Sequence, residues 1–198
     1  MRCLVLLGAF SMSLMADSLS QGERDRSMSH LHATRKMFLD ALAGLSEAQL
    51  NWKPSPERWS VAEVAEHLAV TEQQVFLTIQ RALKEPAAPE RKAETKGKDE
   101  LILKAVPDRS RKVQAPEVVR PTGRWNTGAD LVAAFKANRD RTIEFVENTP
   151  EDLRSHFAPH PFLGLFDSYQ WTVFLAAHTD RHVQQMKEVL AEAGFPKR

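Results

Sequence analysis

Apolar residues recur at α-helical spacing in four long stretches of this 198-residue sequence, and one long interruption separates the second stretch from the third. Start signals accompany this pattern, because Ser20 and Glu23 match a capping box and Ser60 can cap the second stretch. The periodicity predicts helices over residues 20–44, 60–85, 129–147 and 168–193. The sequence is therefore expected to fold as an all-α four-helix bundle.

The interruption covers residues 86–126 and is rich in Pro, Lys and Glu, with a short helix expected at Asp99–Val106. A crossover of this length lets the second and third helices run parallel, whereas a short loop favours an antiparallel pair. With 42% hydrophobic residues, the chain can bury one sizeable core. We therefore expect residues 17–198 to form a single domain that contains this crossover.

Residues 1–16 differ from the rest of the chain, since Arg2 precedes an apolar run that is too short to span a bilayer as a helix. This pattern predicts a signal peptide cleaved after Ala16, no stable membrane anchor, and a periplasmic or secreted protein. Cleavage would also remove Cys3, the only cysteine. The alternative is a start at Met12 or Met28, which would leave the protein in the cytoplasm.

The charge balance argues against one class of partner. With 27 basic and 26 acidic residues, the chain has no surplus of one sign to attract nucleic acid or an anionic membrane. It also has no basic stripe interleaved with aromatic residues. We therefore expect no nucleic-acid partner.

Three histidines in the predicted helices are candidate metal ligands. His178 and His182 are four residues apart, so they project from one face of the fourth helix, and His67 lies in the second helix. Neutral imidazoles suit Zn, Ni, Cu and Fe, and three of them leave coordination positions open for water or substrate. His178 and His182 can therefore bind one ion together, and His67 is the candidate third ligand of this divalent metal site, with Zn or Ni as the preferred ion.

Two motifs around these histidines resemble a known family, the DinB-like or DinB/YfiT-like metalloenzymes. The motifs are Trp-Ser-x-x-Glu-x-x-x-His-Leu at 59–68 and His-x-x-Arg-His-x-x-Gln at 178–185, with a lead-in at 44–52. The resemblance covers roughly residues 20–193. It implies an up-down-down-up bundle, a metal site and a homodimer. The family includes thiol S-transferases, a thiol-dependent isomerase and hydrolases, so the resemblance implies a metal site better than a reaction.

The sequence predicts roles for several neighbouring residues. Glu63, one turn before His67, is the candidate catalytic residue, either as the acceptor that fixes the tautomer of His67 or as a general base. Its alternative is a solvent-facing charge favoured in the first turn of a helix. Gln185 can hydrogen-bond near the site, and Arg181 is expected to pair with a carboxylate on another helix. His160 lies in a Pro-rich segment expected to be a loop, either near the mouth of the site or on the surface.

Three functional interpretations remain open. The first is a metal-dependent enzyme acting on a small-molecule substrate, with a hydrolase favoured over a thiol S-transferase because thiol cofactors are mainly cytosolic. The second is a non-catalytic metal-binding bundle. The third is a purely structural bundle whose histidines are packed core residues.

Overall fold

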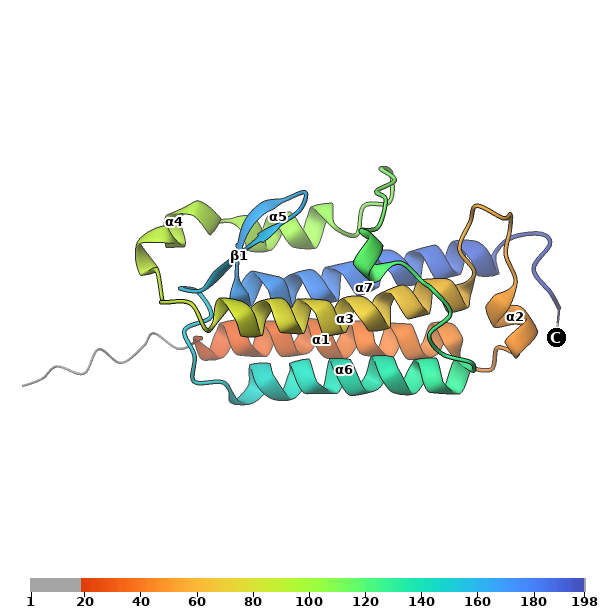
Figure 1. Ribbon diagram of the computed structural model, residues 1–198, viewed down its shortest axis with the longest axis horizontal. Coiled ribbons are helices and arrows are strands. Elements are labelled where there is room, and N and C mark those ends of the chain that lie inside the picture. The colour runs from red at the N-terminus through yellow and green to blue at the C-terminus, as the bar shows by residue number, and fades with distance from the viewer. Residues whose placement is uncertain (1–18, 198) are drawn as a thin grey trace, which may run out of the picture.

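The computed structural model describes residues 19–197, so the predicted signal peptide at 1–16 lies outside the described residues. Four long helices form a bundle in which α3 and α6 run parallel, and α1 and α7 run in the opposite direction (Figure 1). These helices are α1 (Gln21–Leu42), α3 (Val61–Ala82), α6 (Gly128–Asn148) and α7 (Ser168–Leu190). The predicted all-α bundle, with its crossover between the second and third long helices, is confirmed.

Short elements occupy the connections. They are α2 (Glu47–Asn51), η1 (Pro89–Arg91), α4 (Lys92–Thr95), α5 (Lys98–Ala105), η2 (Glu117–Val119), β1 (Phe157–His160) and β2 (Gly164–Asp167). The helix expected inside the crossover corresponds to α5. The crossover passes back along the bundle and brings η2 beside α3 (Figure 1).

The segment before α7 was predicted to be a loop, and this prediction is wrong. β1 and β2 pair as an antiparallel hairpin with His160 opposite Gly164. Gly164 has a φ of 74°, a conformation that glycine adopts without strain, and it lets the chain reverse there. The turn is also held by His160, whose Nδ1 accepts hydrogen bonds from two backbone amides.

Local capping explains where the long helices begin. Ser20, Ser60 and Asp167 each accept a hydrogen bond from the backbone amide three residues later, and the side chain at that position bonds back to the cap. Such a reciprocal box satisfies backbone donors that a helix start leaves free. Among residues 19–197, no helix has both the length and the apolar character needed to cross a bilayer.

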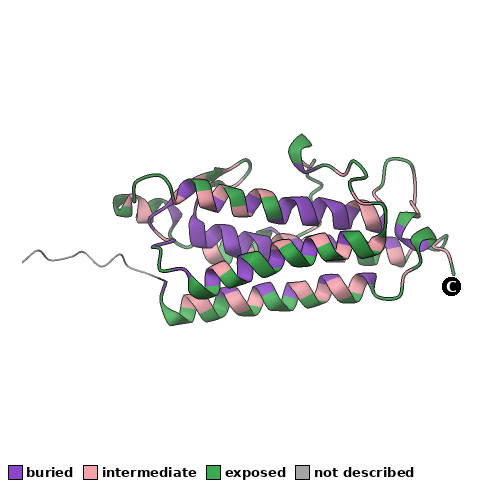
Figure 2. Cartoon of the chain, turned by 60° about the horizontal axis from the view of Figure 1, so that its bottom comes forward, coloured by how far each residue is buried: buried purple, intermediate pink, exposed green. Residues whose placement is uncertain are grey.

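The apolar core divides into two clusters along the bundle, and the buried residues lie on the inward faces of the long helices (Figure 2). On α7, the first cluster ends at Ala177 and the second begins at Val183. His178 and His182 lie between these two positions. The bundle therefore contains a polar layer between its two apolar clusters.

Arg139 is the largest fully buried side chain in this layer, and it connects all four long helices. From α6 it forms an ion pair with Glu72 on α3, with 2.9 Å from Nε to the carboxylate. Its other nitrogens donate to Leu31 and Thr34 on α1 and to Thr179 on α7. Because Thr179 follows His178 directly, this network also fixes α7 next to the histidines.

Candidate metal centre

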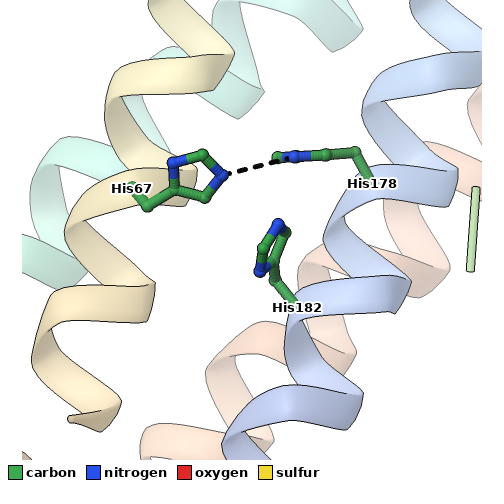
Figure 3. A group of neighbouring side chains, drawn as sticks. All are labelled: His67, His178 and His182. Carbon is green, nitrogen blue, oxygen red and sulfur yellow. Dashed lines mark hydrogen bonds between the residues drawn. The ribbon is translucent and has the colours of Figure 1, made fainter. Parts of the chain in front are cut away.

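Three imidazoles converge between α3 and α7 (Figure 3). One nitrogen from each of His67, His178 and His182 lies within 4.8 Å of the others. The Nε2 atoms of His67 and His178 are 3.3 Å apart. Two nitrogens at about 2.0–2.1 Å from one tetrahedral ion would be separated by roughly 3.3 Å. The spacing of this pair therefore fits ligands that share an ion.

Hydrogen bonds set the tautomer of two of these rings. The Nδ1–H of His67 donates to the carbonyl of Val119 at 2.7 Å. The Nδ1–H of His182 donates to Oε1 of Gln185 at 2.8 Å. Since Nδ1 carries the proton in both rings, each Nε2 keeps a free lone pair. An oxygen acceptor behind each imidazole is the arrangement that orients histidines on metals.

Burial keeps the three rings neutral. It lowers the pKa of His67, although the bond to Val119 acts in the opposite direction. Burial also lowers the pKa of His178 and His182 well below the usual range, and repulsion between the imidazoles adds to that effect. Neutral imidazoles with free lone pairs are the donors that d-block ions prefer. The donor set of the cluster therefore fits the predicted divalent metal.

Glu63 does not have the predicted contact with His67. Its carboxylate accepts a hydrogen bond from the amide of Ser60 at 2.8 Å and pairs with Lys53 at 2.9 Å. The acceptor that fixes the His67 tautomer is the carbonyl of Val119. The predicted acceptor role is wrong because Glu63 is the third residue of α3, where the capping box uses its carboxylate, whereas its role as a general base stays a prediction. Glu63 lies in the first turn of α3, where a negative charge is favourable, as the alternative interpretation predicts.

Glu66 has a positioning role that the sequence reasoning missed. Its side chain is buried, and its carboxylate accepts hydrogen bonds from the amides of Thr122 and Gly123 at 2.7 and 2.9 Å. These bonds hold residues 117–123, here called the strap, against α3. The strap carries Val119, so Glu66 supports the carbonyl that orients His67. The available signal was an acidic residue within the apolar run at 64–70.

The crossover also contacts α7. Arg181 donates to the carbonyls of Val106 and Asp108, and to that of Arg111 at 2.7 Å. The prediction that Arg181 pairs with a carboxylate on another helix is therefore wrong. Arg109 pairs with Glu188 and donates to Oε1 of Gln185 at 3.3 Å. The crossover thus supplies the hydrogen-bond acceptor of His67 and contacts that of His182.

Glu66→Ala is expected to loosen the strap, because two amides would lose a buried charged acceptor. Such bonds contribute about 1.5–3 kcal/mol each. We expect hydrogen exchange at residues 122 and 123 to accelerate at least tenfold while α7 keeps its protection. The matched control is Glu117→Ala, which removes an exposed carboxylate from the same strap. Equal exchange in Glu66→Ala and wild type would show that Glu66 does not hold the strap.

Comparisons with known proteins identify the family and the fold of this chain. A family model for the DinB superfamily matches residues 30–186. YuaE, an uncharacterized protein of Bacillus subtilis, is 31% identical over 162 residues, which cover 82% of this chain and 96% of YuaE. The structure of YfiT from Bacillus subtilis is described as a probable metal-dependent hydrolase with an unusual four-helix bundle topology. It matches with a TM-score of 0.63 over 91% of this chain and 93% of YfiT, at 13% identity. At that identity the likeness concerns the fold.

Proposed function

Since this chain belongs to the DinB superfamily, we propose that it is a metal-dependent hydrolase whose divalent ion is held by His67, His178 and His182. The observation that carries the proposal is the convergence of three neutral imidazoles, two of which have their Nε2 lone pairs set by oxygen acceptors. Zn or Ni is the ion we propose, because both suit imidazole ligands.

The cluster has the ligand count of a catalytic site. Within residues 19–197, the group consists of three histidines, with no cysteine or carboxylate among them. Catalytic zinc sites use three protein ligands and keep a position open, whereas structural sites close the fourth position with another side chain. A divalent ion bound here would lower the pKa of a coordinated water and polarise a substrate carbonyl.

The chain's own residues would position and shield the reacting groups. Val119 and Gln185 orient His67 and His182, and the strap lies against His67, which is almost fully buried. The sequence from residue 17 onward has no cysteine, so this part of the chain supplies no thiolate nucleophile. Water-dependent hydrolysis needs none. YfiT, which shares the fold, is described as a probable metal-dependent hydrolase, and this also supports the choice.

A substrate panel tests the proposal. Zn- and Ni-loaded wild type would be assayed on esters, amides and lactams, and on electrophiles with and without a small thiol. We expect hydrolysis by the loaded protein at least 100-fold above the apo protein, and its loss in His178→Ala. His32→Ala, which replaces an exposed histidine of α1, is the matched control.

The other outcomes separate the alternatives. Turnover that requires the added thiol would indicate an S-transferase. Metal bound at one equivalent without turnover on any substrate would indicate a non-catalytic metal-binding bundle. Equal rates for apo and loaded protein would contradict a metal-dependent hydrolase.

A further inference from the structure

His178 is the least buried of the three histidines in the cluster. The strap covers His67, which is 3% exposed, and the ring of Trp59 lies 5.2 Å from it. His182 is 9% exposed, with Gln185 bonded behind it. In contrast, residues 166–177 are all buried, and His178 is the first partly exposed residue after them. The side of the cluster next to His178 is therefore the least covered by the described residues.

Aromatic side chains continue from this side of the cluster. The ring of Phe174 is 5.1 Å from His178, and the ring of His160 is 4.8 Å from Phe174. Phe162, in the hairpin turn, is 6.1 Å from His160 and is 62% exposed. His160, Phe162 and Phe174, here called the aromatic wall, therefore connect the hairpin turn to a proposed metal ligand.

His160 also has an available hydrogen-bond donor. Its Nδ1 accepts hydrogen bonds from the amides of Phe162 and Leu163, each at 3.2 Å. The proton of the neutral ring must therefore be on Nε2. Burial lowers the pKa of His160 to about 4, so the ring is neutral at physiological pH. In the described part of the chain, this Nε2–H has no acceptor.

We infer that the aromatic wall is part of the substrate site and that His160 contacts the substrate. This inference rests on the proposed function and adds a substrate class to it. The favoured substrate carries an aryl or similarly bulky apolar group beside the atoms that bind the metal, together with an acceptor for His160. Small-molecule sites combine such apolar surfaces with a few fixed polar groups. Aromatic contacts with the wall would contribute most of the selectivity.

Two metal-binding probes test this inference on the full-length protein loaded with Co²⁺. Acetohydroxamate and benzohydroxamate share the group that chelates metals and differ in a methyl or a phenyl substituent. Their dissociation constants would be measured from the change in the visible Co²⁺ spectrum. We expect benzohydroxamate to bind wild type roughly tenfold more tightly, because the phenyl group buries more apolar surface.

The ratio of the two dissociation constants, acetohydroxamate over benzohydroxamate, would also be measured in three variants. We expect it to fall below about threefold in His160→Ala and Phe162→Ala, and to stay at the wild-type value in Val113→Ala, which shortens an exposed apolar residue of the crossover. If His160→Ala does not fold, Phe162→Ala alone tests the inference, because the loss of an exposed ring leaves the hydrogen bonds of the hairpin in place.

Two failures can be told apart. The inference alone would be overturned if wild type shows Co²⁺ bands but binds the two hydroxamates with nearly equal dissociation constants. The same holds if neither His160→Ala nor Phe162→Ala lowers the ratio of these constants. The absence of Co²⁺ bands in wild type would overturn the proposed metal site, and the inference with it.

Discussion

His178→Ala is expected to weaken metal binding by about 100-fold or more. A four-ligand zinc site in a small domain provides about 10–16 kcal/mol, so one ligand accounts for roughly 3 kcal/mol, or about two orders of magnitude in affinity. His178 is also the ring whose Nε2 lies 3.3 Å from that of His67, so its loss would break the closest pair. The measurement is competition for Zn²⁺ against a chromophoric chelator.

His32→Ala controls for the loss of an imidazole as such, since His32 is exposed on α1. Its affinity is expected to equal that of wild type. Circular dichroism would check that His178→Ala keeps its helices. Wild-type affinity in a folded His178→Ala protein would exclude His178 as a ligand.

Arg139→Met is expected to lower the free energy of unfolding by about 3–5 kcal/mol, because it leaves Glu72 buried without its partner. Both side chains are almost completely buried, at 0% and 1% exposed. The change also removes the donors to Leu31, Thr34 and Thr179. Urea denaturation of wild type and variant would measure the difference.

A double variant separates the ion pair from simple packing. Arg139→Met combined with Glu72→Leu removes both charges and is expected to be more stable than Arg139→Met alone, because no unpaired carboxylate remains. Arg26→Met, which breaks an exposed pair with Glu100, is the control and is expected to cost at most about 1 kcal/mol. If Arg139→Met lowered the free energy of unfolding by no more than Arg26→Met does, the buried network would contribute little.

The long helices could be predicted from the sequence because their signals are local. A capping residue and the apolar spacing lie within the same segment, so Ser20 and Ser60 mark starts that the structure confirms. The parallel direction of α3 and α6 also followed from the length of the crossover. The convergence of His67 with His178, by contrast, rested on the resemblance to a family, because those residues are far apart in the chain.

The surroundings of the histidines could not be predicted, because they depend on contacts between distant segments. The bond from His67 to Val119 joins positions 52 residues apart, and the bond from Arg139 to Thr179 joins positions 40 apart. No local pattern identifies which carbonyl the crossover places behind His67. The helical spacing of Glu63 from His67 predicts a contact between them, whereas the capping box binds the Glu63 carboxylate and the strap binds that of Glu66.

Anomalous diffraction from crystals of the Zn-loaded protein would show directly whether the three histidines bind one ion. We expect a single strong peak at the zinc edge between α3 and α7, at about 2.0–2.1 Å from the Nε2 atoms of His67, His178 and His182. A crystal grown with excess Zn²⁺ that shows no anomalous density among these three nitrogens would contradict the proposed metal site.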